Sequence, residues 1–246
     1  MQLVWQQDSF RVRPAPLRAN PGKGYNRCVS DPEEGRTALL CGATGLVGSH
    51  CLNLLLADPY YKKVVALTRR PLGSVLSNPK LDQRIVDFDQ LDDFTGGLQV
   101  DHVLSALGTT IAKAGSQEKF RQVDFDYPLA IARAALDAGA QHLVLVSSLG
   151  ADPEGRVFYL KVKGELEAAI SELGFKGVTY LRPSLLVGER QEPRLAEQFY
   201  EVLLKAAPRR YRGVPAETVA RVMVESAKAE RPGCQIIESP EIAAFA

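Results

Sequence analysis

The chain has 246 residues, 46% of them hydrophobic, and a formal net charge of +1 at pH 7. This length and hydrophobic content suffice for one large α/β domain with a sizeable core. The nearly balanced charge excludes proteins that bind nucleic acid or anionic membranes through a general electrostatic field. No apolar run approaches the roughly 18 residues of a membrane span, and no secretory segment is present. The sequence therefore predicts a protein of the reducing cytoplasm.

The cysteines and histidines give no sign of a metal site. The four cysteines, at positions 28, 41, 51 and 234, form neither a CxxC pair nor a metal-ligand spacing. Cys41 ends an apolar run and Cys51 lies on the apolar stripe of a helix-like segment, which favours inert packing. The three histidines have no acidic partner at ligand spacing. No metal is therefore expected.

Residues 1–36 differ in composition from the rest of the chain. They contain four prolines and no sustained apolar periodicity, and before Asp31 five basic residues are opposed only by Asp8. We expect a poorly ordered N-terminal arm over residues 1–36 and one folded domain over residues 37–246. A targeting leader and an upstream start codon are the alternative interpretations of the arm.

The domain is organised around the stretch Thr37–Cys51, TALLCGATGLVGSHC. The apolar run Ala38–Cys41 is typical of a strand buried on both faces of a parallel sheet. Glycines follow at positions 42, 45 and 48, and a helix-like segment comes after them. A strand, a glycine turn and a helix point unpaired backbone N–H groups at an anion, and the glycines allow close approach to a pyrophosphate. The stretch predicts nucleotide binding.

Strands and helices alternate along the remainder. Further strands are predicted at residues 63–68, 83–88, 101–107, 142–148 and 178–182, with a short last strand at 235–238. Helices are predicted at 116–139, 156–173, 194–206 and 215–229, and Pro128 should kink the first of them or start a new segment. This alternation predicts an α/β fold: a doubly wound, mainly parallel Rossmann-type sheet with helices on both faces, in a single domain.

Ligands of such sheets gather beyond the carboxyl ends of the strands. These ends carry the glycine turn, Arg69-Arg70, Asp87, Gly108-Thr109-Thr110, Ser147-Ser148 and Arg182-Pro183. A fold that selects NAD places a carboxylate at the end of the second strand, whereas this strand is followed by Arg69 and Arg70. A guanidinium grips a 2′-phosphate with two charge-assisted bonds. The arginines therefore predict NADP(H), unless they only cap the strand in solvent.

Tyr159 and Lys163 form a Tyr-x-x-x-Lys spacing after the fifth strand. Residues four apart share one face of a helix, and an ammonium group favours the phenolate of a neighbouring tyrosine. The pair can move a proton to or from a substrate oxygen, to which Ser148, or alternatively Ser147, would hydrogen-bond. A solvated aromatic residue with a cation one turn away is the structural alternative.

The motifs GATGLVG and YLKVK, with the Ser-Ser strand end, resemble the short-chain dehydrogenase/reductase superfamily in its atypical branch. The longer phrases ALGTTIAKAGSQEKFRQVD, SSLGAD, FYLKVKGELEA and LRPSLLVGERQE resemble the HIV Tat-interacting oxidoreductase family and its bacterial relatives. The similarity runs from about Thr37 to the C-terminus.

The resemblance implies an NADP(H) site with catalytic Tyr159, Lys163 and Ser148. It implies cofactor contacts at Thr44, Gly45, Leu46, Val47, Arg69, Leu107, Gly108, Lys163, Leu186 and Arg194, with Asp87 added at the adenine by general analogy. Gly42 of the glycine turn and Arg70 after the second strand are cofactor-binding candidates from the residues themselves. Many larger relatives use an Asn before the fifth strand in a proton relay, and the nearest candidate here is Asp124. Elements on the substrate side are expected within residues 183–246.

The resemblance implies an NADPH-dependent oxidoreductase that reduces a small carbonyl compound, with Tyr159 as proton donor. An NADP(H)-binding regulator or scaffold without turnover is the first alternative, and a nucleotide-sugar-type epimerase or isomerase is the second. A homodimer or a protein partner is compatible with each of these functions. The substrate itself stays open, because the chain lacks a long substrate lid.

Overall fold

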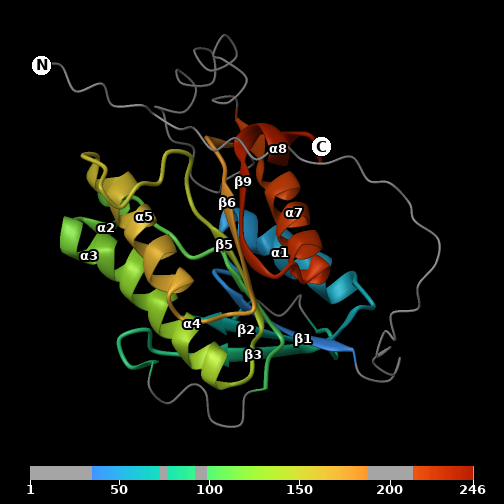
Figure 1. Ribbon diagram of the computed structural model, residues 1–246. Coiled ribbons are helices and arrows are strands. Elements are labelled where there is room, and N and C mark those ends of the chain that lie inside the picture. Colours follow the sequence, from blue (N-terminus) through green and yellow to red (C-terminus); the bar gives the residue numbers. More distant parts are fainter. Residues whose placement is uncertain (1–34, 73–76, 92–98, 188–212, 246) are drawn as a thin grey trace, which may run out of the picture. The chain divides into compact units, whose positions relative to one another are not determined.

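Seven strands form one sheet in which every neighbouring pair is parallel (Figure 1). The computed structural model describes residues 35–72, 77–91, 99–187 and 213–245. In sheet order the strands are β3 (Leu81–Ile85), β2 (Tyr61–Thr68), β1 (Arg36–Cys41), β4 (His102–Ser105), β5 (His142–Val146), β6 (Gly177–Arg182) and β9 (Gly233–Glu238).

The inner strands are the uninterrupted apolar runs of the sequence. All residues of β4 and β5 are buried, and so is β1 from Thr37 onward. Such runs suit strands that are covered on both faces, as parallel sheets require. The edge strands β3 and β9 are partly exposed and carry charged residues, which discourages further strands from pairing with them.

Helices cover both faces of the sheet (Figure 1). One apolar cluster joins the sheet to α1 (Leu46–Ala57), α7 (Ala216–Ala229) and α8 (Ser239–Ala243). A second cluster on the opposite face joins it to α4 (Tyr127–Asp137) and α5 (Phe158–Ser171). The predicted doubly wound α/β fold is therefore confirmed.

The region predicted as one helix at 116–139 is divided into several elements. They are α3 (Gln117–Arg121), the π-helical turn η2 (Gln122–Asp126) and α4, and a separate short helix, α2 (Ile111–Ala114), precedes them. Pro128 lies in the first turn of α4, where a missing N–H costs nothing, so the expected new segment is present. The π turn was not predicted. Such turns are rare and often lie at functional sites.

Three short elements were not predicted. β7 (Leu186–Val187) and β8 (Val214–Pro215) form a separate parallel pair, and α8 follows β9 behind a capping box made by Glu238 and Glu241. β1 begins at Arg36, the last residue of the predicted arm. Residues 1–34 and the helix predicted at 194–206 lie outside the described residues.

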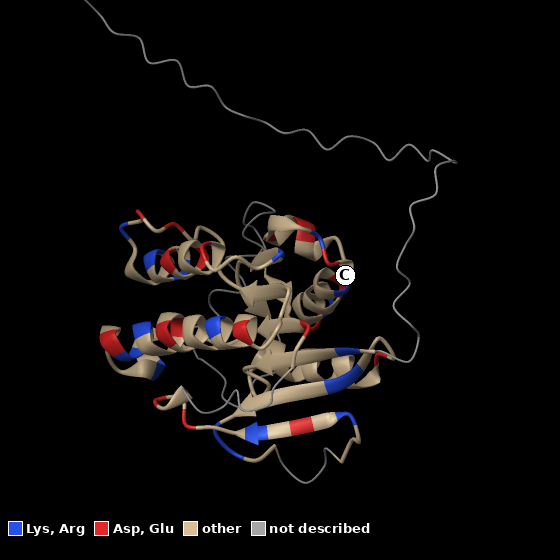
Figure 2. Cartoon of the chain, turned by 60° about the horizontal axis from the view of Figure 1, so that its bottom comes forward, with Lys and Arg blue, Asp and Glu red and all other residues tan. Residues whose placement is uncertain are grey.

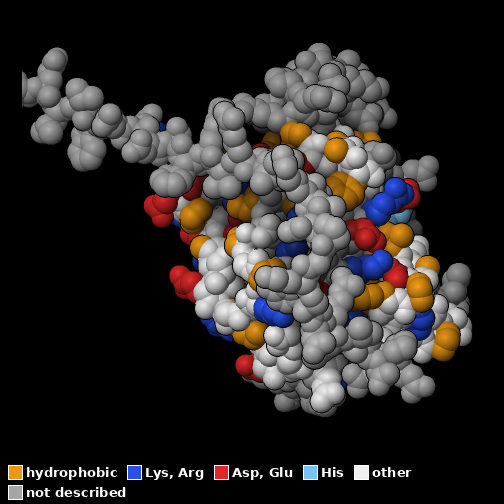
Figure 3. Space-filling model, turned by 45° about the vertical axis from the view of Figure 1, so that its right-hand side comes forward, with side chains coloured by type: hydrophobic (Ala, Val, Ile, Leu, Met, Phe, Trp, Pro, Cys, Tyr) orange, Lys and Arg blue, Asp and Glu red, His pale blue; other side chains and the backbone are white. Residues whose placement is uncertain are grey.

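The described surface carries charges of both signs. Acidic and basic positions alternate along the outer helices (Figure 2), and on the face shown in Figure 3 apolar, acidic and basic side chains are interspersed. In the described ranges no helix is long and apolar enough to span a membrane, and no three ligand-type side chains gather as a metal site would need. Burial raises the pKa of Cys41 and Cys51 to about 12, so both thiols are inert.

A buried polar network closes the amino ends of the strands. His102 lies 3.0 Å from the Tyr61 hydroxyl through Nδ1 and 3.0 Å from Glu230 Oε1 through Nε2. Glu230 Oε1 also accepts from the Tyr60 hydroxyl at 3.1 Å and pairs with Arg36 at 3.0 Å. Glu230 adopts a left-handed backbone at the end of α7 with φ 44°. Three contacts on one carboxylate hold it there.

This network predicts a loss of stability on acidification. Burial lowers the pKa of His102 and of His142, and the Glu230 carboxylate only partly offsets this. The unfolded chain therefore takes up these protons first, at about pH 6.5. Stability is complete above that pH and is lost as the pH falls through the lower folded pKa.

We expect the free energy of unfolding, measured with urea, to fall between pH 7.5 and pH 5. His102→Gln should be less stable at pH 7.5 and should show a smaller fall, which His142 still sustains. His50→Gln, at a half-buried position outside the network, is the control and should follow the wild type. An unchanged fall in His102→Gln would contradict this assignment.

Candidate functional site

The turn between β1 and α1 depends on close backbone contacts at two glycines. Gly42 has φ +84°, and a Cβ there would lie 2.6 Å from the carbonyl oxygen of Ala106 at the end of β4. A Cβ on Gly48 would lie 2.0 Å from the carbonyl oxygen of Gly42. Any larger residue would push α1 away from the sheet. The glycines therefore bring the start of α1 to the point between β1 and β4.

The first turn of α1 presents free backbone donors. Gly45 is the N-cap and makes no side-chain cap hydrogen bond. The first N–H groups of an α-helix have no partner within the helix, and they carry the positive end of its dipole. A strand, a tight turn and an uncapped helix start form a ready anion site.

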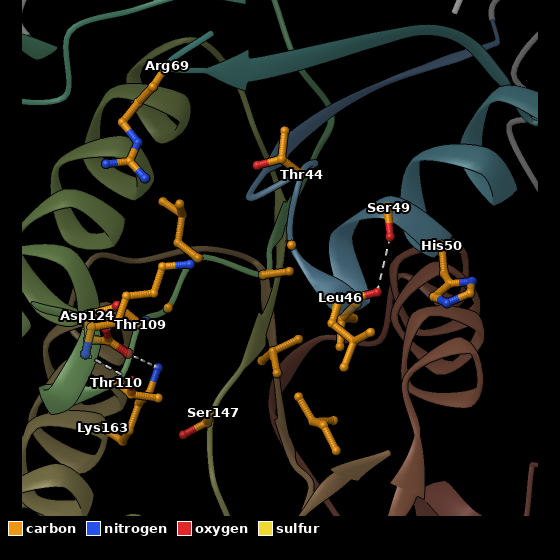
Figure 4. A pocket seen from close by; sticks show the side chains of 18 of the residues that line it. Thr44, Leu46, Ser49, His50, Arg69, Thr109, Thr110, Asp124, Ser147 and Lys163 are labelled. Carbon is orange, nitrogen blue, oxygen red and sulfur yellow. Dashed lines mark hydrogen bonds and ion pairs between the residues drawn. The ribbon is translucent and has the colours of Figure 1, made fainter. Parts of the chain in front are cut away.

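A pocket of about 820 Å³ opens above this turn. Figure 4 shows Thr44, Leu46, Ser49 and His50 on the α1 side, with Thr109, Thr110, Asp124 and Lys163 opposite them and Arg69 toward one end. The lining also includes Gly45, Val47, Arg70, Ala106, Leu107, Gly108, Lys113, Val146, Ser147, Tyr159 and Leu186. The pocket therefore lies beyond the carboxyl ends of β1, β2, β4 and β5.

Two exposed arginines lie at one end of this space. Thr44, Arg69, Arg70 and Pro71 line a smaller cavity of about 340 Å³. Within the described ranges no carboxylate is within ion-pair distance of either arginine. Two guanidinium groups beside the glycine turn, without a carboxylate partner in the described part of the chain, can bind a phosphate.

Gln83 of β3 fixes the backbone that carries these arginines. Its Nε2 donates to Thr68 Oγ1 at 2.6 Å and to the Arg70 carbonyl at 3.0 Å, while its Oε1 accepts from Leu72 N at 3.2 Å. Sequence reasoning missed this residue. Its polar side chain within a strand was the available signal, because a half-buried amide needs partners.

A buried ion pair lies in the wall opposite α1 (Figure 4). Lys163 Nζ lies 2.8 Å from Asp124 Oδ1, and Thr109 N donates to Asp124 Oδ2 at 2.8 Å. Burial alone would lower the pKa of Lys163, but the Asp124 carboxylate, together with Tyr159 and Glu167, outweighs burial and raises that pKa above its ordinary value. Lys163 therefore stays an ammonium group.

Tyr159 lies one helical turn before Lys163, and both line the pocket. The tyrosine is half-buried, and its ring packs against that of Phe120 with 5.5 Å between centroids. Phe120 is fully buried and also contacts Phe158. The aromatic packing fixes the Tyr159 ring at the edge of the pocket, beside the ammonium group.

The two serines after β5 have different surroundings. Ser147 lines the pocket, and its hydroxyl donates to Glu167 Oε1. Arg182 holds the same carboxylate through Nε at 3.1 Å and Nη2 at 2.5 Å. Ser148, the serine preferred from the sequence, is not among the lining residues, and its carbonyl accepts from Ala151 N.

The other predicted residues fall into three groups. Thr44, Gly45, Leu46, Val47, Leu107, Gly108 and Leu186 line the pocket together with both arginines. Gly42 lies in the turn beneath the lining, and Asp87 lies outside it, where its Oδ1 accepts from Asp89 N at 3.0 Å. Arg194 lies outside the described residues. Ser49, His50, Lys113 and Val146 line the pocket without having been predicted.

The fold and this pocket together define a dinucleotide-binding protein of the Rossmann type. Residues 42–230 match the family model described as NAD(P)H-binding. Protein HTATIP2 of Rattus norvegicus is 36% identical over 199 residues, which cover 78% of this chain and 81% of that protein. Protein fmp52, mitochondrial, of Emericella nidulans is 39% identical over 165 residues, which cover 64% and 70%.

Solved structures share the fold at lower identity. MoeE5 in complex with UDP-glucuronic acid and NAD superposes with a TM-score of 0.66 at 19% identity, over 82% of this chain and 76% of that chain. The Bordetella bronchiseptica enzyme WbmH in complex with NAD+ gives a TM-score of 0.63 at 18% identity, over 83% and 76%.

The chain belongs to the NAD(P)H-binding family, as an atypical member of the short-chain dehydrogenase/reductase superfamily. The resemblance drawn from its motifs is therefore confirmed. The expected cytoplasmic location is wrong by the same comparison, because the fungal relatives are named as mitochondrial proteins. Balanced charge and the lack of an apolar run do not distinguish the two compartments.

The contact at Gly42 can be tested against a matched glycine. Gly174 has a similar backbone, with φ +93°, but no atom lies within 4 Å of a Cβ placed there. Gly174→Ala should incur only the left-handed penalty of about 1–2 kcal/mol. Gly42→Ala should lose a further ~1–3 kcal/mol from the forced overlap. Urea unfolding measures both, and equal losses would contradict the contact.

Proposed function

We propose that the chain is an NADPH-dependent oxidoreductase that reduces a small carbonyl compound. The carrying observation is that Tyr159 and Lys163 line the same pocket as the glycine turn and the two arginines. Proton donor, ammonium group and anion site thus share one cavity of about 820 Å³. That volume lies within the usual range for small-molecule and cofactor sites.

The residues fit a nicotinamide dinucleotide. The turn residues Thr44–Val47 would lie along the pyrophosphate at the start of α1, and Arg69 with Arg70 would hold the 2′-phosphate. Lys163 would donate to the ribose hydroxyls. Two observations support this fit. Gly42 and Gly48 let α1 pack closely against the sheet, so that the space above the turn stays open. No carboxylate of the described residues lines the cavity beside the arginines.

The chain's own part in the reaction is proton transfer. The reduced nicotinamide, when bound, supplies the hydride that goes to the carbonyl carbon. Tyr159 donates its hydroxyl proton to the carbonyl oxygen as that oxygen gains negative charge, and the product is an alcohol. The Lys163 ammonium stabilises the phenolate left behind, which regains a proton from solvent.

Ser147 supports this assignment of roles. Its only hydroxyl proton is given to Glu167 Oε1, and Arg182 holds that carboxylate in place. In this arrangement Ser147 can accept a hydrogen bond from the pocket but cannot donate one. Tyr159 therefore carries the donation to the substrate oxygen.

We expect NADPH to bind at least about tenfold tighter than NADH. A charged hydrogen bond to the 2′-phosphate contributes ~1.5–3 kcal/mol, or roughly 10- to 150-fold. Arg69→Ala should weaken NADPH binding by that factor and leave NADH nearly unchanged. Arg133→Ala, at an exposed position of α4, is the control. Titration calorimetry with NADPH and NADH measures both affinities. Equal affinities of the wild type for the two cofactors would contradict the assignment of NADP.

We expect Tyr159→Phe to lose about 10²–10⁴-fold in turnover of aldehydes and ketones. NADPH binding should persist, because the phenyl ring keeps the contact with Phe120. A panel of carbonyl compounds followed by NADPH absorbance is the measurement. Tight NADPH binding without turnover of any compound by the wild type would instead favour a regulator or scaffold. Turnover retained in Tyr159→Phe would refute the proton-donor role.

A further inference from the structure

Asp124 makes two contacts to groups that border the pocket. It lies in the π-helical turn η2 between α3 and α4, which carries its side chain toward α5. One carboxylate oxygen faces the Lys163 ammonium at 2.8 Å, and the other accepts from Thr109 N at 2.8 Å. A single side chain thus joins α5 to the segment after β4.

The pair is almost completely removed from water. The side chain of Lys163 is 4% exposed and that of Asp124 is 1% exposed. Oδ1 lies at ion-pair distance from Nζ, so the two opposite charges face each other directly. A buried charge that loses its partner is strongly destabilised, because no solvent replaces the partner.

The other groups that act on Lys163 cannot replace Asp124. Tyr159 and Glu167 act on it from its own helix, one turn away on either side. Glu167 already binds the Arg182 guanidinium and the Ser147 hydroxyl. Asp124 is the carboxylate that compensates Lys163 among the residues described.

Gly108 allows the same carboxylate to approach the pocket segment. A Cβ at Gly108 would lie 3.3 Å from Asp124 Oδ1 and 3.7 Å from Lys163 Nζ. A larger residue would therefore crowd the ion pair. The glycine and the bond to Thr109 N hold residues 108–109 against the two charges.

We propose that Asp124 is a positioning residue that keeps Lys163 charged and fixed and holds residues 108–109 in place, so that the ribose-binding part of the site is ordered before cofactor enters. The inference rests on the proposed contact between Lys163 and the cofactor. Asp124 itself touches neither cofactor nor substrate in this assignment.

The variant Asp124→Asn removes the negative charge and keeps nearly the same side-chain shape. Its amide oxygen can still accept from Thr109 N, but it no longer compensates the ammonium group. Burial then lowers the pKa of Lys163, which the carboxylate raises in the wild type. The ammonium is lost as the pH rises, so NADPH affinity should fall toward alkaline pH in the variant alone.

NADPH affinity would be measured by calorimetry between pH 7 and pH 9 for the wild type, Asp124→Asn and Asp126→Asn. Asp126 is an exposed acid of the same π turn and serves as the control. We expect the NADPH affinity of Asp124→Asn to fall by about tenfold more than that of the wild type across this range, which corresponds to a free-energy difference of one pKa unit. The affinities of the wild type and Asp126→Asn should change with pH in the same way. If the NADPH affinity of Asp124→Asn depended on pH in the same way as that of the wild type, the inference would be overturned.

A double-mutant cycle with Lys163→Met keeps the test decisive if Asp124→Asn folds poorly. Lys163→Met leaves the Asp124 carboxylate buried without its cation, and adding Asp124→Asn removes that charge. The double variant should therefore melt at a higher temperature than Lys163→Met. A double variant that melts no higher than Lys163→Met would refute the pairing. Failure of the wild type to bind NADPH at any pH would refute the proposed function instead.

Discussion

The whole site depends on backbone packing against backbone where β1 turns into α1. A side chain at Gly48 would overlap the Gly42 carbonyl, and one at Gly42 would overlap the Ala106 carbonyl of the neighbouring strand. These contacts bring the uncapped start of α1 into the gap between β1 and β4. From there the pocket reaches the arginines after β2 on one side and α5 on the other. Loss of either contact would separate the anion site from the Tyr159 and Lys163 side chains.

Much of this could be predicted because the signals are local. A buried strand, three glycines and the start of a helix follow one another within 15 residues, Thr37–Cys51, and the inner strands are single apolar runs. To decide whether Ser147 or Ser148 faces the pocket, one must also know which side of β5 each serine lies on. Leu143 and Leu145 pack on the α5 side, so alternation places Ser147 there and Ser148 on the opposite side. Which face of the sheet α5 covers is decided by tertiary packing, and no residue near the two serines indicates it.

Other features carry no local signal. Nothing in the residues 122–126 marks a π turn, since no proline or glycine lies within it. Its extra residue nevertheless directs Asp124 at Lys163. The network of Glu167 with Arg182 is likewise a contact between a helix and a strand 15 residues apart. Such pairs are decided by tertiary packing, because a buried charge must find its partner wherever the fold brings one.

The two ends of the sheet treat charge differently, and the difference bears on function. At the amino ends, Glu230 is bound by Arg36, Tyr60 and His102, so the network is closed by its own side chains. At the carboxyl ends, the described pocket lining holds four cations, Arg69, Arg70, Lys113 and Lys163, against the single carboxylate of Asp124. A cleft lined mainly by one sign of charge concentrates ligands of the opposite sign. Because Asp124 compensates only Lys163, the lining keeps an excess of positive charge that favours an anionic ligand.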